Sequence, residues 1–114
     1  MLLAALASVV IASCYDGDTC TTTTGERVRL ACIDTPELSG KRAEPVAASA
    51  ARDHLRGLVV GEGVGIRRIT EDRFGRTVAE LFLGKRNVQE EMVGTGHAEV
   101  YPRYAHQCPW TEGW

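Results

Sequence analysis

Short β-branched segments alternate with glycine and aspartate turns in the first 34 residues, and this pattern constrains the fold more than any other feature. Val, Ile and Thr favour extended backbone because their branched side chains pack well on a pleated surface. The pattern predicts strands at residues 7–15, 19–24 and 27–33. Asp16-Gly17-Asp18 and Gly25-Glu26 are the predicted turns between them.

A helical segment follows at residues 45–59. Pro45 suits a first helical turn, alanines follow it, and Gly61 and Gly63 are expected to end the helix. Positions that repeat every four residues would share one face of this helix. They are Val46, Ala50, His54 and Leu58.

The second half of the chain returns to strands at residues 64–69 and 77–83, joined by a turn at residues 72–75. A second helix is predicted at residues 88–94, and residues 101–114 are expected to be irregular. A chain of 114 residues is long enough for one domain with one core, not two. The order of elements therefore predicts an α+β fold that is mainly β, a five-stranded Greek-key barrel with two flanking helices.

The charge balance argues against one class of nucleic-acid protein. The chain has 13 Lys and Arg against 15 Asp and Glu, a formal net charge of −2. A protein that holds nucleic acid mainly by bulk charge is usually strongly basic, so this chain is not expected to be one. The balance is compatible with an enzyme that gathers carboxylates around a metal ion and presents arginines locally.

The four cysteines leave two interpretations open. Cys14, Cys20, Cys32 and Cys108 include no C-x-x-C pair, and no histidine lies at zinc-finger spacing, which argues against a structural zinc site. An even count is compatible with one or two disulfides in an exported protein, and a hairpin would bring Cys14 to face Cys20. Four free thiols are the equal alternative.

The apolar N-terminus indicates export, to a secreted or periplasmic location. Residues 1–10 contain no Lys or Arg and are too short to cross a bilayer, so no membrane span is expected. Residues 1–8 are predicted to be either a signal-peptide remnant or the leading part of the first strand. Residues 9–114 are predicted to form a single domain.

Two aspartates lie where neighbouring strands are predicted to end. Asp18 is at the tip of the first hairpin, and Asp34 ends the strand beside it. Carboxylates so placed can converge on one hard cation, with carbonyls and water completing an oxygen shell. Glu37 follows behind the rigid Pro36, where it can take a proton from an attacking water. The alternative is that the aspartates form turns and Glu37 is a solvent-facing loop acid.

Two arginines are candidates for holding a phosphate. Arg29 lies five residues before Asp34, and Arg76 closes the turn that begins at Asp72. Phosphodiester hydrolysis builds negative charge on the phosphorus oxygens, which planar guanidinium groups stabilise with paired hydrogen bonds. The alternatives are an exposed strand position for Arg29 and an ion pair between Arg76 and Asp72.

Taken together, these segments resemble the staphylococcal nuclease (thermonuclease) family. The resemblance rests on Tyr15-Asp16-Gly17-Asp18-Thr19, on Val28-Arg29-Leu30 leading into Ile33-Asp34-Thr35-Pro36-Glu37, and on Asp72-Arg73-Phe74-Gly75-Arg76. Gly84 through Val88, Val93 with Gly96, and Tyr104 continue it. The combination of these motifs at this separation is a strong signal.

The resemblance implies an OB-type five-stranded barrel that cleaves DNA and RNA with the help of Ca²⁺ and acts as a monomer. Three groups would hold the calcium ion, namely the carboxylates of Asp18 and Asp34 and the carbonyl of Thr35. Three side chains would be catalytic: Glu37 would activate water, while Arg29 and Arg76 would stabilise the transition state. Asp16 would contact the metal ligands without binding the metal itself.

The sequence also departs from the family pattern. Phe74 stands where many members have Tyr, so a phenol contact to phosphate would be lost, although Arg73 would supply charge there. Tyr104 would stack on a base, and plain packing at the rim of the barrel is the equal alternative. The type member of the family has a further C-terminal helix, whereas this chain stops ten residues after Tyr104, which leaves a third flanking helix open. The alternative function is a non-catalytic OB-fold module that binds single-stranded nucleic acid.

Overall fold

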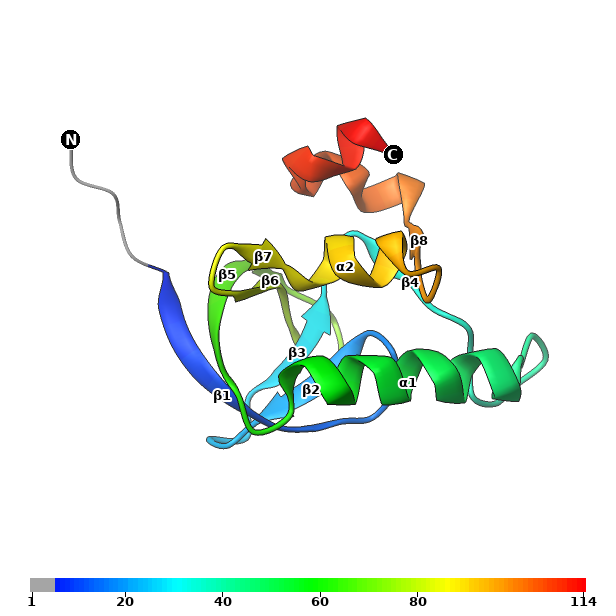
Figure 1. The fold of residues 1–114 in the computed structure, drawn as a ribbon, viewed down its shortest axis with the longest axis horizontal. Coiled ribbons are helices and arrows are strands. Elements are labelled where there is room, and N and C mark those ends of the chain that lie inside the picture. The colour runs from blue at the N-terminus through cyan, green and yellow to red at the C-terminus, as the bar shows by residue number, and fades with distance from the viewer. Residues whose placement is uncertain (1–5) are drawn as a thin grey trace.

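Five strands close a barrel in the computed structural model, which describes residues 6–114 (Figure 1). The sheet runs in the order β3-β2-β1-β5-β6-β7 with antiparallel neighbours, and a parallel pairing of β3 with β6 closes the ring. The strands are β1 (Ala7–Cys14), β2 (Thr19–Thr22), β3 (Arg27–Leu30), β5 (Gly63–Glu71), β6 (Thr77–Leu83) and the short β7 (Arg86–Asn87). The predicted five-stranded, mainly β barrel is confirmed.

The predicted strand at residues 27–33 is interrupted, and the interruption positions part of the site. β3 ends at Leu30, and Cys32 adopts a left-handed backbone with a φ of 69°, which is uncommon for a residue other than glycine. The chain then leaves the barrel for β4 (Ile33–Asp34), which pairs with β8 (Glu99–Val100) in a separate two-stranded sheet. Asp34 therefore lies on a different sheet from Arg29.

Helix α1 (Pro45–Val59) and helix α2 (Val88–Gly94) have the predicted bounds, but the expected face of α1 is wrong. Its buried residues are Ala48, Ala51, Leu55 and Val59, whereas Val46 is 86% exposed. Small and apolar residues occur on both faces of this helix, so periodicity alone did not decide which face packs. Arg56 fastens α1 to the barrel by donating from Nε to the carbonyl of Cys14.

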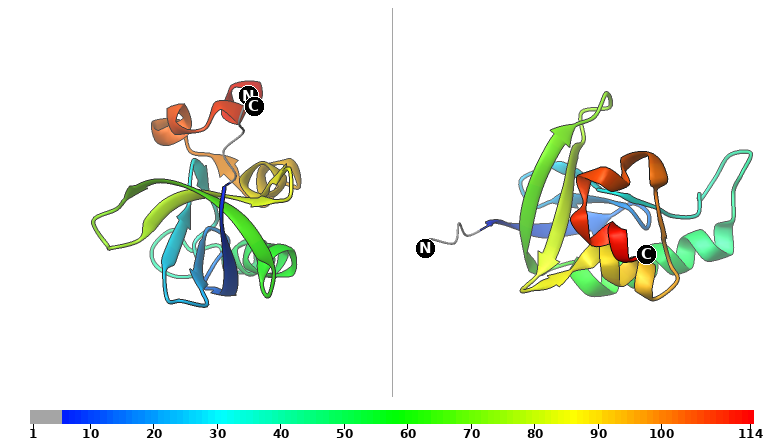
Figure 2. Two further views of the ribbon diagram at one scale, coloured as in Figure 1. Left: turned by 90° about the vertical axis from the view of Figure 1, so that its left-hand side faces the viewer. Right: turned by 90° about the horizontal axis from the view of Figure 1, so that it is seen from above.

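The hairpin of β5 and β6 projects beyond the barrel, as Figure 2 shows. Glu26, in the turn before β3, holds this arm by accepting hydrogen bonds from Arg68 and from the hydroxyl of Thr77. Arg27 donates a further hydrogen bond to the carbonyl of Phe74 at the tip. These contacts place the turn that carries Arg76 beside β3.

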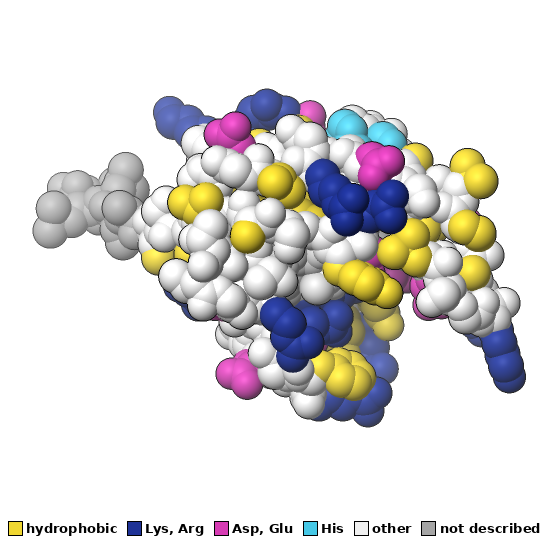
Figure 3. All heavy atoms as spheres, turned by 90° about the horizontal axis from the view of Figure 1, so that it is seen from below, with side chains coloured by type: hydrophobic (Ala, Val, Ile, Leu, Met, Phe, Trp, Pro, Cys, Tyr) yellow, Lys and Arg dark blue, Asp and Glu magenta, His cyan; other side chains and the backbone are white. Residues whose placement is uncertain are grey.

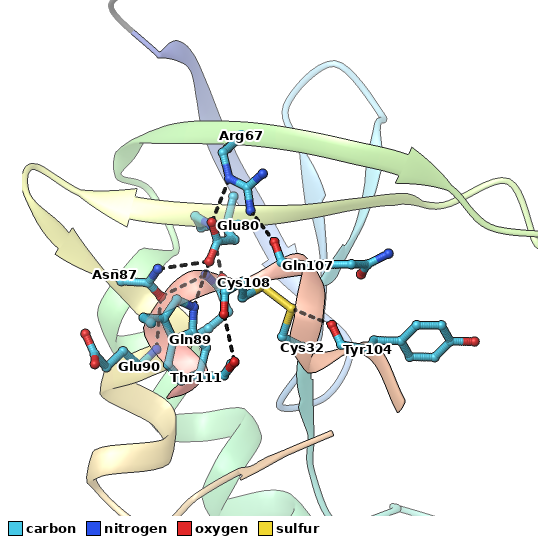
Figure 4. Close-up of polar contacts among 12 residues, drawn as sticks. Cys32, Arg67, Glu80, Asn87, Gln89, Glu90, Tyr104, Gln107, Cys108 and Thr111 are labelled. Atoms are coloured by element: carbon cyan, nitrogen blue, oxygen red, sulfur yellow. Dashed lines mark hydrogen bonds and ion pairs between the residues drawn. A yellow bond between two sulfur atoms is a disulfide. The ribbon is translucent and has the colours of Figure 1, made fainter. Parts of the chain in front are cut away.

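The C-terminal segment forms two 3₁₀-helices, η1 (Pro102–Gln107) and η2 (Pro109–Gly113), where irregular structure was expected. They lie beside α2 (Figure 1), so two 3₁₀-helices, and no third α-helix, follow Tyr101 within the residues that the structure describes. Glu80 on β6, only 3% exposed, anchors them because its carboxylate accepts from Arg67, Asn87 and Trp110 (Figure 4). Three donors satisfy a buried carboxylate that would otherwise be costly.

All four cysteines form disulfides, which settles the alternative left open by the sequence. Cys14 and Cys20 are paired across β1 and β2, with their Cα atoms 3.8 Å apart. The bond between Cys32 and Cys108 joins the corner after β3 to the C-terminal segment, 76 residues further on.

The structure describes only part of the N-terminal segment, residues 1–8, for which a signal-peptide remnant or the start of the first strand was predicted. Ala7 and Ser8 belong to β1 and pair with β5. Residues 1–5, on which a signal-peptide remnant was predicted, lie outside the described residues. No helix of the described part of the chain has the length and apolarity needed to cross a membrane.

Candidate active site

Asp18 lies at the centre of a set of converging polar groups. Its Oδ2 accepts a hydrogen bond of 3.0 Å from the hydroxyl of Thr35, and its Oδ1 accepts one of 3.1 Å from the hydroxyl of Thr19. Nη2 of Arg29 lies 3.4 Å from the same Oδ2. Asp18 is 7% exposed, so these partners hold a nearly buried carboxylate in one orientation.

Asp16 is the second acid of this loop. Its Oδ1 accepts a hydrogen bond of 3.0 Å from the backbone N–H of Asp18. Burial, together with the neighbouring Asp18 carboxylate, raises the pKa of Asp16 to about 6. The loop therefore brings two acids close together.

Gly17 separates these two acids because no larger residue fits there. A Cβ at this position would lie 2.8 Å from Cβ of Ala51 and 3.0 Å from Cγ2 of Thr35. The loop backbone thus packs directly on α1 and on the segment after β4. This close approach is what brings Asp18 within reach of Thr35.

Asp34, at the end of β4, and Glu37, three residues further along the chain, both face solvent. Both residues are exposed, and within the described residues neither carboxylate forms a hydrogen bond or ion pair. The backbone carbonyl of Glu37 accepts from the N–H of Glu44, which fixes the start of the loop that leads to α1. The two side chains are therefore free to turn toward a ligand.

The donors around Asp18 suit a hard cation. Asp16, Asp18, Asp34 and the hydroxyl and carbonyl of Thr35 offer only oxygen, the ligand that calcium prefers. Within residues 6–114, no three Asp, Glu, His or Cys side chains form a ready-made metal cluster. A cation here would therefore depend on few carboxylates, with carbonyl oxygen and water completing its shell.

Beside Asp18 lies a groove of about 640 Å³ that is rich in arginine. It is lined by the corner after β3, the β5–β6 turn and η1, and four of its lining residues are Arg29, Arg73, Arg76 and Arg103. Arg29 joins the groove to the acidic loop: Nη1 donates to the carbonyl of Leu30 and Nη2 to that of Ile33, at 2.6 and 2.9 Å. The structure thus places a fixed guanidinium between the acids and the groove.

Arg76 is held by the acid that begins its own turn. Nε of Arg76 lies 2.7 Å from Oδ2 of Asp72, while Oδ1 accepts from the backbone N–H groups of Phe74 and Arg76. Burial opposes ionisation, but the hydrogen bonds from Arg76 and Phe74 outweigh it and lower the pKa of Asp72. Because only Nε of Arg76 is used among the described residues, its outer nitrogens remain for a ligand.

Aromatic side chains line the same groove. Phe74, 57% exposed, lies beneath the guanidinium groups of Arg73 and Arg76, whose Cζ atoms are 4.8 and 5.3 Å from its centroid. Tyr104 pairs with Tyr101 at 5.3 Å. Figure 3 shows Lys and Arg side chains gathered beside hydrophobic ones at the lower edge of its face, over the β5–β6 turn.

The structure therefore divides the predicted site residues into two neighbouring groups. Thr35 and Arg29 contact Asp18, whereas Arg73, Arg76 and Tyr104 lie with Arg29 in the groove. Sequence reasoning missed Arg103, which shares the groove. It lies in a segment without periodicity, and only the path of the chain brings it there.

A family model described as "Staphylococcal nuclease homologue" matches residues 27–112. The chain belongs to the staphylococcal nuclease family. The predicted resemblance is confirmed, and the barrel described above is the expected architecture.

Several curated proteins are similar to this chain. An "Uncharacterized endonuclease" of Haemophilus influenzae is 37% identical over 95 residues, which cover 80% of this chain and 51% of the relative. "Probable endonuclease LCL3" of Candida tropicalis is 41% identical over 80 residues, covering 65% and 34%. "Staphylococcal-like nuclease CAN1" of Arabidopsis thaliana is 32% identical over 87 residues, covering 74% and 25%. The chain spans about half or less of the length of these relatives.

Proposed function

We propose that this chain is a metal-dependent endonuclease that hydrolyses phosphodiester bonds in DNA and RNA. The observation that carries the proposal is the position of Arg29, which contacts Asp18 on one side and lines the arginine groove on the other. A phosphate held by the groove would therefore lie beside the acids. Relatives named as endonucleases and nucleases support this class of reaction.

Each side chain has a defined part in this proposal. Arg29 on β3 and Arg76 in the β5–β6 turn both line one groove, where their guanidinium groups would bind the phosphate oxygens as negative charge builds up. Glu37 is exposed and unpaired within the described residues, so it can take a proton from water. Arg73 and Tyr104 would hold the flanking nucleotide by charge and stacking.

We propose calcium as the cofactor, with Asp18, Asp34 and the carbonyl of Thr35 as its ligands and Asp16 behind them. The oxygen-only donor set supports this assignment. A bound calcium ion would supply positive charge to the phosphate. We further propose that the protein acts as a monomer in an oxidising, exported location, an idea supported by its two disulfides.

The test is cleavage of denatured DNA by purified protein in calcium, in excess EDTA, and with two variants. We expect cutting in calcium, none in EDTA, and a loss of at least about a hundredfold in Glu37→Gln, the usual scale for removing a general base. Glu44→Gln is the matched control, because Glu44 is an exposed acid at the other end of the same loop. Arg76→Ala is expected to abolish most of the activity.

The outcomes separate the competing functions. Full cutting by Glu37→Gln would overturn the assigned base, and full cutting in EDTA would overturn the metal. Tight binding of single strands by a wild-type protein that cuts nothing would favour the non-catalytic OB-fold module.

A further inference from the structure

Arg103, like Arg73, differs from the groove arginines Arg29 and Arg76 in having no carboxylate partner among the described residues. Arg29 and Arg76 each lie against a carboxylate, at 3.4 Å from Asp18 and 2.7 Å from Asp72. Arg103 forms no ion pair with any residue that the structure describes, and it is exposed. Its guanidinium is therefore available to an anion entering the groove.

The ring of Tyr104 restricts where that guanidinium lies. Cζ of Arg103 is 5.5 Å from the ring centroid, within the range of a cation–π contact. Tyr104 in turn pairs with Tyr101, and all three residues line the groove. Arg103 thus presents a positive charge beside two aromatic rings, a combination typical of sites that hold unpaired nucleotides.

The segment that carries Arg103 is fastened at both ends of η1. The N–H of Tyr101 donates to the carbonyl of Cys32 at 2.8 Å, and Cys108 is bonded to Cys32. Arg67 donates to the carbonyl of Gln107 at 2.8 Å, as Figure 4 shows. Sγ of Cys32 also lies 3.3 Å from the carbonyl oxygen of Tyr104, a packing contact because a disulfide sulfur carries no proton. The Cys32–Cys108 disulfide therefore fixes η1 over the groove.

The size of the groove leaves room for more than the phosphate that is cut. About 640 Å³ lies within the range of sites that enclose a drug-sized ligand. Arg29 and Arg76 account for one phosphate under the proposed function. Arg103 comes from a third element, so its charge is an additional one along the path of the strand.

We propose that Arg103, held by the Cys32–Cys108 disulfide, is a substrate-binding residue that contacts a phosphate next to the one that is cut in a single-stranded nucleic acid. The inference rests on the proposed function for its substrate class. It does not depend on cleavage, because binding alone reports it.

The experiment measures the affinity of a fluorescent oligothymidine for the Glu37→Gln protein, by anisotropy over a series of salt concentrations. We expect Arg103→Ala to weaken binding about tenfold, the usual scale for one charge-assisted hydrogen bond. The slope of log affinity against log salt should become shallower by about 0.7, the value for one phosphate contact in a single strand. Arg103→Lys should keep the wild-type slope. Arg86→Ala, which removes an exposed arginine outside the groove, should change neither quantity.

In the cutting enzyme, Arg103→Ala should raise KM for the oligonucleotide and leave kcat within about twofold, the pattern of lost uniform binding. Equal effects of Arg103→Ala and Arg86→Ala would reduce the role of Arg103 to bulk charge and overturn the inference. Failure of the Glu37→Gln protein to bind would overturn it too. If Arg103→Ala weakened binding as expected but the wild-type protein cut nothing, only the proposed function would be overturned.

The role of the disulfide has its own test in the same assay. The paired change Cys32→Ser with Cys108→Ser should weaken binding, and adding Arg103→Ala should then have little further effect, because the two act through one contact. The other disulfide, changed in the same way at Cys14 and Cys20, should leave the effect of Arg103→Ala intact. If the effects of the disulfide change and of Arg103→Ala on the binding free energy were fully additive, the disulfide would have no role in positioning Arg103. Because Arg103 is exposed, its single variants decide the binding role even where a disulfide variant does not fold.

Discussion

The hydroxyl of Thr35 donates a hydrogen bond of 3.0 Å to Oδ2 of Asp18, and so ties the segment after β4 to the loop between β1 and β2. Asp18 is 7% exposed, so water cannot easily replace this donor. We expect Thr35→Val to lower the free energy of unfolding by about 1.5–3 kcal/mol, the usual cost of losing a hydrogen bond to a charged group. Chemical denaturation measures this change.

The same variant should bind calcium more weakly, because the Asp18 carboxylate would no longer be held in one orientation. Calorimetric titration with Ca²⁺ measures this effect. Thr35→Ser keeps the hydroxyl and serves as the control. A Thr35→Val protein with wild-type calcium affinity would show that the hydroxyl stabilises the fold without shaping the metal site.

Gly17 offers a test of the packing that places Asp18. We expect Gly17→Ala to lower the free energy of unfolding by about 1–3 kcal/mol, because its Cβ would press on Ala51 and Thr35 in a filled space. Adding Ala51→Gly should recover part of this loss in a double-mutant cycle. Gly57→Ala is the matched control: nothing lies within 4 Å of its new Cβ, and it should stabilise α1 by up to about 1 kcal/mol. A neutral Gly17→Ala would contradict the close approach.

Local signals predicted the elements well, and tertiary contacts decided the rest. The bounds of α1 were predictable because Pro45 and Gly61 mark its two ends. Its packed face was not, since alanines occupy both faces of the helix. The break at Cys32 was missed because its left-handed backbone is supported by the N–H of Tyr101, 69 residues later, and by Cys108.

In the candidate site, too, some residues were predictable from local sequence and others depend on tertiary contacts. Motifs identified Asp18, Arg29 and Arg76 by residue type and spacing, and in the structure Arg29 lies against Asp18 and lines a groove together with Arg76. Nothing local in the sequence pointed to Arg103 or to Glu80, whose buried carboxylate anchors η2 through Trp110. Both depend on where the C-terminal segment packs, and that segment carries no periodic pattern.

Asp72 is expected to matter for catalysis through Arg76. Asp72→Asn can keep the two hydrogen bonds from the backbone of the turn but loses the carboxylate oxygen that accepts from Nε of Arg76. We therefore expect kcat to fall about tenfold with little loss of stability, the scale of one charge-assisted hydrogen bond. Steady-state cleavage of a single-stranded oligonucleotide measures the effect.

Glu71→Gln is the control for this change, because it removes one charge from the same groove and leaves Arg76 and its partner in place. Since the pKa of Asp72 is lowered, the ion pair should persist below the usual carboxylate range, and mild acid should not mimic Asp72→Asn. Equal kcat values for Asp72→Asn and the wild type would show that Arg76 needs no support from its turn.

His54 should make the fold less stable in mild acid. Its ring stacks on that of His97 with centroids 4.3 Å apart, and its buried Nε2 has no hydrogen-bond partner among residues 6–114. Burial and the neighbouring His97 lower the pKa of His54, while Glu91 partly opposes them. The unfolded chain therefore takes up a proton near pH 6.5 that the folded protein resists, so the free energy of unfolding falls as the pH drops below that value.

We expect the loss of stability between pH 7.5 and 5, measured by chemical denaturation, to be smaller in His54→Gln than in the wild type, because glutamine does not titrate. The comparison between variants matters, since other groups also titrate over this interval. His106→Gln, at an exposed position in η1, is the control for replacing a histidine by glutamine elsewhere in the fold. An equal loss of stability on acidification in His54→Gln and in the wild type would show that His54 accepts a proton in the fold as readily as in the unfolded chain.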